Sequence, residues 1–160
     1  MAVGALSAVL ALALGVVRGL PQAAAAEASS CAAPVPENPT IAWIDPKSAK
    51  ARFDAGEALA VDARPGVDFQ QGHVLDALSL PKPDVPPAPA YLTVLRQAPL
   101  VIVYGSTSGE CALAKALARS LVSAGIHHVQ LLQGGFPRWL ELGYPAQAGP
   151  CKLCPQSSSP

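Results

Sequence analysis

The sequence is poor in charge, and neither sign is in excess. Only 14% of its 160 residues are charged, and 11 basic and 11 acidic side chains give a formal net charge of zero. Lysine and arginine are scattered along the chain, so no basic face and no acidic tail is indicated. These absences argue against nucleic acid as a partner and favour small molecules or proteins.

Metal-ligand motifs are equally scarce. Cys151 and Cys154 form one C-x-x-C pair, but the chain lacks a second such pair and an H-x-x-x-H motif, so a complete zinc site is not predicted. His127 and His128 are adjacent, and neighbours on a strand point to opposite faces, which argues against a shared metal. We expect neither a metal nor a cofactor.

The start of the chain lacks the positive residues that usually precede the apolar core of a signal peptide. Residues 2–17 are uncharged and nearly all apolar, and they are followed by Arg18 and a small-residue tract at 22–26. A signal peptide accounts for the alanines of that tract, whereas a membrane anchor accounts for Arg18, although a straight span needs roughly 20 apolar residues. Residues 1–26 are therefore predicted to be one or the other. Membrane association through residues 2–20 or export to the cell envelope follows, with the side of the membrane left open.

Apolar residues make up 51% of the chain, which leaves room for one domain with a sizeable core. Residues 27–40 are rich in Ala, Ser and Pro and predict a linker, in which Cys31 is a free or disulfide-paired thiol. The folded domain is expected over residues 41–148. A flexible tail that contains the C-x-x-C pair is expected over residues 149–160.

Residues 100–125 organise the domain. Residues 100–103 are a continuous aliphatic run, which is typical of a strand buried on both faces of a parallel sheet, and we expect it to be the central strand. A helix is predicted to follow and to end at Gly125, because five apolar residues recur at helical spacing: Ala114, Leu117, Ala118, Leu121 and Val122. The loop between them is predicted to curl its backbone N–H groups around an anion. It consists of Gly105, Ser106, Thr107, Ser108, Gly109 and Glu110.

Strand and helix signals alternate along the rest of the domain. Strands are expected near residues 41–43, 58–61 and 129–132, and helices from Asp45-Pro46 to Gly56 and over 91–97 and 136–142. The stretches after Gly72 and over 81–89 are expected to be irregular connections. This order predicts an α/β domain with a mostly parallel sheet.

Several short motifs follow one another along the folded part of the chain. The first half carries Val61-Asp62-Ala63-Arg64, Asp68-Phe69, Gly72-His73-Val74-Leu75-Asp76-Ala77 and Leu80-Pro81. The second half carries a strand that ends at Tyr104, a small-residue loop, Leu132-Gln133-Gly134-Gly135, Trp139 and Gly143-Tyr144-Pro145. In this order they resemble the D-x-R…E-[YF]…G-H-[IV]-x-x-A…P signature and the second half of the rhodanese domain. The resemblance implies a five-stranded, mostly parallel sheet flanked by helices, with an active-site loop at the carboxyl edge of the sheet.

The residue after the strand's tyrosine departs from the family pattern. In active rhodanese domains this residue is the cysteine that becomes a persulfide while it carries sulfur from a donor such as thiosulfate. Here it is Gly105, which offers no nucleophile. The resemblance therefore implies a domain without the standard sulfurtransferase activity, which binds a small sulfur-containing anion or a partner protein. Five residues separate Gly105 from Cys111, as in the related dual-specificity phosphatase loop, but the cysteine and the arginine of that loop are both missing.

Cys111 supports an alternative, in which the domain is a sulfurtransferase or a thiol-exchange enzyme. A thiol in the first turn of a helix is expected to have a lowered pKa, and its thiolate could take up sulfur or form a disulfide. The other interpretation of Cys111 is a small residue that fills space against the sheet. Cys151 and Cys154 are interpreted as a tail disulfide or as a candidate redox pair that exchanges with Cys111.

Four further residues are expected to support the site. Asp62 and Arg64 are predicted to form an ion-pair network with Asp68 beside the loop, and the resemblance places Arg64 near the active site. His73 is interpreted as a hydrogen-bonding residue at the start of a strand rather than as a general base.

Overall fold

The computed structural model describes residues 41–81, 87–106 and 110–154. The predicted signal peptide or anchor at residues 1–26, the linker at 27–40 and Cys31 lie outside the described residues. No helix within the described ranges combines the length and the apolar character needed to cross a membrane.

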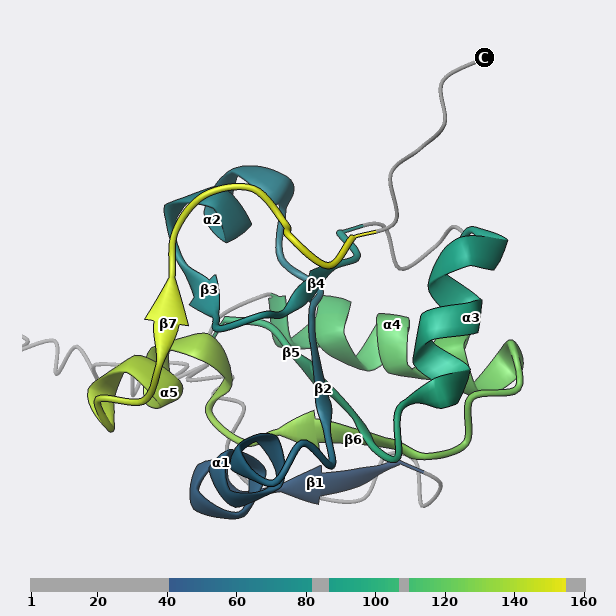
Figure 1. The fold of residues 1–160 in the computed structure, drawn as a ribbon, viewed down its shortest axis with the longest axis horizontal. Helices are drawn as coiled ribbons and strands as arrows, with labels where there is room; N and C mark the ends of the chain where they lie inside the picture. The colour runs from purple at the N-terminus through teal and green to yellow at the C-terminus, as the bar shows by residue number, and fades with distance from the viewer. Residues whose placement is uncertain (1–40, 82–86, 107–109, 155–160) are drawn as a thin grey trace, which may run out of the picture.

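A five-stranded parallel sheet forms the centre of the domain (Figure 1). Its strands lie in the order β1 (Ala42–Ile44), β6 (Val129–Leu132), β5 (Val101–Tyr104), β2 (Leu59–Asp62) and β4 (Leu78–Ser79). Each neighbouring pair is parallel. All four residues of β5 are buried, because successive side chains point to opposite faces and both faces are covered. The predicted fold class and the predicted central strand are therefore confirmed.

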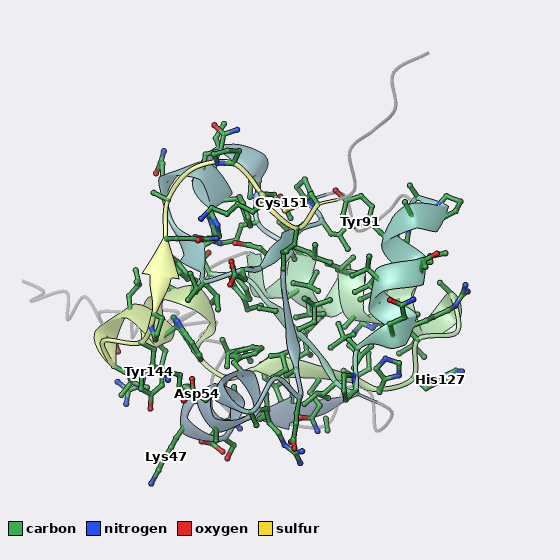
Figure 2. The ribbon with its side chains drawn as sticks, in the orientation of Figure 1. Lys47, Asp54, Tyr91, His127, Tyr144 and Cys151 are labelled. Carbon is green, nitrogen blue, oxygen red and sulfur yellow. A yellow bond between two sulfur atoms is a disulfide. The ribbon has the colours of Figure 1, made fainter. Side chains whose placement is uncertain are left out.

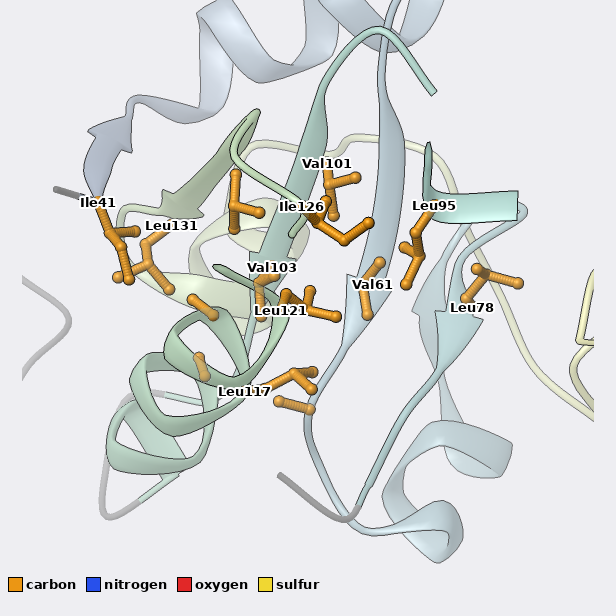
Figure 3. Packing of buried hydrophobic residues seen from close by; sticks show 14 residues of the cluster. Ile41, Val61, Leu78, Leu95, Val101, Val103, Leu117, Leu121, Ile126 and Leu131 are labelled. Carbon is orange, nitrogen blue, oxygen red and sulfur yellow. The ribbon is translucent and has the colours of Figure 1, made fainter. Parts of the chain in front are cut away.

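Helices cover both faces of the sheet. One face carries α1 (Pro46–Asp54), α2 (Gly66–Gln71) and α5 (Gly135–Glu141), and the other carries α3 (Pro89–Gln97) and α4 (Glu110–Ser123). Alternate residues of β5 belong to two separate apolar clusters. Val101 and Val103 share a cluster with Leu121 of α4 (Figure 3), whereas Ile102 shares the other with Trp139 of α5. The two-residue period of the strand thus builds one core on each face.

The structure contains four short elements that the sequence analysis does not predict, and two of them, β3 (His73–Val74) and β4, lie in the stretch after Gly72 that it expects to be irregular. The other two are α2 and β7 (Ala146–Gln147). β3 and β7 form a separate antiparallel pair. A segment of two residues is too short to show a periodic pattern. In addition, β3 pairs with a strand at the other end of the domain, so the local sequence does not predict this pairing.

The packed part of the chain continues beyond Ala148, although the flexible tail is expected to begin at residue 149. Gly149 donates its backbone N–H to Gln70 O at 2.8 Å, and Cys151 and Cys154 form a disulfide and pack against the core. In Figure 1 this yellow segment arcs from β7 past α2 to β4, where Figure 2 labels Cys151. The physical reason is that the segment covers β4, the edge strand whose backbone groups would otherwise face solvent.

Candidate functional site

A cleft of about 520 Å³ lies beside the carboxyl ends of β2 and β5. Arg64 follows β2 and Ser106 follows β5, and the parallel pairing of these strands brings both residues to one edge of the sheet. Gln71 at the end of α2, Phe136 of α5 and Gln147 of β7 contribute to the walls. Open α/β sheets bind their ligands outside the carboxyl ends of the strands, so this cleft is the candidate functional site.

Arg64 is held at the cleft by buried partners. The carboxylate of Asp62 accepts hydrogen bonds from Nε and Nη2 of Arg64 at 2.6 to 3.2 Å, and Gly72 O accepts one from Nη2 at 2.6 Å. The guanidinium carbon lies 4.2 Å from the centre of the Phe136 ring. Burial opposes the charge of Arg64, but the hydrogen bonds and the charge of Asp62 outweigh it and raise the pKa of Arg64 above its ordinary value. Of the predicted network, Asp62 and Arg64 form the ion pair, and Asp68 lines the same cleft.

Tyr104 ties the central strand to β3. Its side chain is buried, and its hydroxyl accepts a hydrogen bond from the backbone N–H of Val74 at 3.0 Å. Burial, and then the nearby carboxylate of Asp62, raise the pKa of Tyr104 well above its ordinary value, so the phenol stays neutral. Because it fixes β3, whose partner strand β7 lines the cleft, Tyr104 is a positioning residue for that wall.

His73 begins β3 and is fully buried. Its Nδ1 donates to Phe69 O at 2.7 Å, because a carbonyl oxygen can only accept, and its ring stacks on the Phe69 ring with 3.6 Å between centres. The other ring nitrogen, Nε2, has no hydrogen-bond partner in the described part of the chain. These contacts agree with the structural role that the sequence analysis assigns to His73.

The loop after β5 starts from a point that is fixed to α5. Gly105 O accepts a hydrogen bond from Phe136 N at 2.9 Å. Gly135 permits this approach, since its φ is +57° and a Cβ at that position would collide with the carbonyl oxygen of Gly105. The Gly-Gly motif is therefore explained by close packing of two backbone segments beside the cleft.

Part of the predicted anion-binding loop lies outside the described residues: Thr107, Ser108, Gly109 and the side chain of Glu110. The side chain of Cys111, the candidate nucleophile, also lies outside them. The backbone of Cys111 is the second residue of α4, so this cysteine stands in the first turn of the helix, as the sequence analysis expects. Gly105 and Ser106 lie at the cleft end of β5. The anion cradle and a chemical role for Cys111 stay predictions.

Cys151 and Cys154 are joined by a disulfide beside the edge strand β4. The described residues that line the cleft do not include either cysteine, so this pair is a separate feature of the molecule. Within residues 41–81, 87–106 and 110–154, no cluster of three histidine, cysteine or acidic side chains is arranged to hold a metal ion.

Several residues of the cleft were not identified from the sequence. Gln71, Leu140, Ala146 and Gln147 all line it, but each belongs to a short helix or strand and to no motif. Only Phe136 had a usable signal, because it directly follows the Gly134-Gly135 motif. The walls of the cleft form where short elements that are distant in the sequence pack side by side, and local sequence patterns do not predict such packing.

The fold and the cleft define a class: an α/β domain with a cleft at the carboxyl edge of a parallel sheet. The model of the family described as the rhodanese-like domain matches residues 45–142. The chain therefore belongs to the rhodanese-like domain family, as the order of its motifs predicts.

Solved structures agree with this assignment. The thiosulfate sulfurtransferase from Pseudomonas aeruginosa is 28% identical with a TM-score of 0.57, over 68% of this chain and 20% of that one. This chain thus spans only a fifth of that enzyme. The rhodanese-like domain of the Alr3790 protein from Anabaena sp. is 26% identical with a TM-score of 0.54, over 74% of this chain and 87% of that one. The BH2092 protein from Bacillus halodurans, at 18% identity and a TM-score of 0.56 over 67% of this chain and 77% of that one, shares the fold.

Proposed function

We propose that the domain binds a ligand in the cleft and lacks the standard sulfurtransferase reaction of active rhodanese domains. One observation carries this proposal: the residue after Tyr104 at the end of β5 is Gly105. Sulfur transfer by the standard route needs a side-chain nucleophile at that place, and glycine has none. The described residues that line the cleft include no cysteine, and the one that follows β5 there is Ser106.

The lining of the cleft favours a ligand with a polar end and an apolar part. Arg64 bonds its buried partners through Nε and Nη2, and Nη1 takes no part in those bonds. Phe136 and Leu140 supply apolar surface beside it. Asp62 balances the charge of Arg64 and Asp68 adds a carboxylate, so the lining does not carry a strong positive charge. A small sulfur-containing anion and an exposed segment of a partner protein are the two ligand classes that we propose.

The alternative function is sulfur transfer or thiol exchange by Cys111. The observation in its favour is that Cys111 stands in the first turn of α4, which begins just after the loop. The partial positive charge of a helix N-terminus stabilises a thiolate, and a thiolate can accept sulfur from a donor. This reaction would move the nucleophile from one end of the loop to the other.

Thiosulfate:cyanide sulfurtransferase activity of the full chain distinguishes the two functions. We expect no activity, and no gain of one sulfur in intact mass after thiosulfate treatment, in the unaltered chain and in Cys111→Ala. Activity and adduct that are present in the unaltered chain and vanish in Cys111→Ala would assign the reaction to Cys111. Gly105→Cys is the matched control, because it restores a thiol where active members carry one and should gain a sulfur adduct.

Titration of the full chain with thiosulfate, sulfate and phosphate tests the anion ligand. Saturable changes are expected in the amide signals of Arg64 and Ser106. Gln71→Ala, in the cleft wall, should weaken these changes. Gln97→Ala replaces another exposed glutamine, on α3 across the sheet, and should leave them unaltered. If none of the three anions gives a saturable change, the anion class is removed and a partner protein remains.

A further inference from the structure

The disulfide between Cys151 and Cys154 rests on the backbone of the edge strand β4. Ser79 N donates to Cys154 Sγ at 3.3 Å, and Ser79 O lies 3.9 Å from the same sulfur. Ala77 O lies 3.6 Å from Cys151 Sγ. Both cysteines are partly exposed, and the two residues between them are exposed, so a thiol from solution has access to the pair.

These contacts favour different protonation states of the two sulfurs when the pair is reduced. Cys154 Sγ has an N–H donor at 3.3 Å, Ser79 N, which is closer than the carbonyl oxygen of Ser79 at 3.9 Å, whereas the contact of Cys151 Sγ is with a carbonyl oxygen. An N–H donor stabilises a thiolate, so the closer contact favours Cys154 as the thiolate and makes it the better leaving group. Ala77 O can only accept a hydrogen bond, and a disulfide sulfur has no proton to donate. That contact becomes a hydrogen bond once Cys151 is a thiol. The backbone of β4 and of Ala77 just before it therefore offers a suitable partner to each sulfur of the dithiol form.

We propose that Cys151 and Cys154 are a thiol–disulfide exchange site that accepts two electrons from a dithiol of a partner protein. A partner thiolate attacks Cys151 Sγ, the bond between the two cysteines breaks, and Cys154 leaves as a thiolate beside Ser79 N–H. The second thiolate of the partner then attacks the partner's sulfur atom in the mixed disulfide and releases Cys151 as a thiolate. The partner dithiol gives up two protons and is oxidised to a disulfide, and the protein disulfide takes up the protons and is reduced. No group of the cleft takes part, so this site does not depend on the ligand proposed for the cleft.

The test uses the full chain with Cys31→Ser and Cys111→Ser, so that Cys151 and Cys154 are its only cysteines. The folded, oxidised protein is mixed with a reduced synthetic peptide that carries two cysteines, the reaction is quenched by alkylation, and both products are weighed by mass spectrometry. We expect one peptide disulfide for each protein disulfide lost. The matched control carries Cys151→Ser and Cys154→Ser in addition and should oxidise no peptide.

A second measurement tests the assigned direction of attack. Glutathione replaces the peptide, and the position of the first mixed disulfide is mapped after rapid acid quenching. The adduct is expected predominantly on Cys151. An adduct predominantly on Cys154 would overturn the roles assigned to the two sulfurs. If the folded protein does not exchange while the same chain in urea exchanges readily, the disulfide is structural and the proposal fails.

Discussion

Asp62 is the residue on which the position of Arg64 depends most. Its side chain is fully buried, and it bonds the guanidinium of Arg64, whose side chain is 7% exposed. Replacing Asp62 by Asn leaves the buried cation without its counter-charge, and breaking a buried pair in this way costs roughly 3 to 5 kcal/mol. Because Asn can still accept one hydrogen bond, we expect Asp62→Asn to lower the free energy of unfolding by about 3 kcal/mol. Urea unfolding of Asp62→Asn beside the unaltered chain measures this change in the free energy of unfolding.

The matched control is an ion pair of the same kind on the surface. Lys50 and Asp54 lie one turn apart on α1, and Lys50 Nζ is 2.6 Å from Asp54 Oδ2. The Asp54 side chain, however, is 61% exposed. Solvent screens such a pair, so Asp54→Asn should change the free energy of unfolding by less than about 0.5 kcal/mol. Equal effects of Asp62→Asn and Asp54→Asn would contradict the buried role of Asp62.

At the residue scale, the sequence predicts pairs that lie close together in the chain and misses pairs that do not. Asp62 and Arg64 are two residues apart, so their motif suffices to predict the ion pair. Tyr104 and Val74 meet only because β5 and β3 are brought together by the fold. The sequence analysis names Tyr104 as a motif residue but predicts no hydrogen-bond partner for it. Val74 lies 30 residues earlier in the chain, and no local pattern links the two residues.

At the element scale, α1 is the helix whose start is best determined by local sequence. Asp45 is the N-cap, and its carboxylate accepts a hydrogen bond from Ser48 N at 3.0 Å. Asp45→Ala removes this acceptor and should lower the free energy of unfolding by about 1 kcal/mol at neutral pH. Asp45→Asn retains an acceptor and should cost much less. Thermal or urea unfolding of the two variants beside the unaltered chain makes the comparison.

The same cap predicts a dependence on pH. The hydrogen bonds from Ser48 lower the pKa of Asp45 below its ordinary value of 3.8. A lowered pKa in the folded state means that the contribution of the carboxylate to stability is present above pH 3.8 and is lost as the pH falls through the lowered pKa. The difference in stability between the unaltered chain and Asp45→Asn should therefore shift in favour of the variant on acidification below that pH. A constant difference would argue against a role for the charge.

Elements were predictable from the sequence where a run or a stripe of apolar residues marks them. The aliphatic run of β5 and the stripe of α4 each fill several periods of their pattern, and the structure places both where they are expected. β3, β4 and β7 have two residues each, which is a single period of a strand, and the six residues of α2 make less than two turns of helix. Of these elements, α2 and β7 contribute Asp68, Gln71, Ala146 and Gln147 to the cleft, so the edge of the sheet that carries the cleft was predictable and the part of its walls built by β7 was not.

At the scale of the whole molecule, the C-terminal segment joins parts of the domain that are otherwise separate. β7 pairs with β3, Gly149 bonds to Gln70 at the end of α2, and the disulfide lies on β4. Residues 146–148 of the same segment line the cleft. The segment therefore acts as a brace between α2, the sheet edge and the wall of the cleft.

Two truncated chains test the brace. A chain that ends at Ala148 loses the hydrogen bond of Gly149 and the packed disulfide, and we expect its free energy of unfolding to fall by about 2 to 3 kcal/mol. Its β7 strand, left at the end of the chain, should fray, and amide exchange of Val74 should quicken because its hydrogen bond to Tyr104 depends on the position of β3. A chain that ends at Cys154 keeps every one of these contacts and should match the full chain in both measurements. If the two truncated chains unfold alike, the segment contributes nothing beyond Ala148 and the domain ends where the sequence analysis places it.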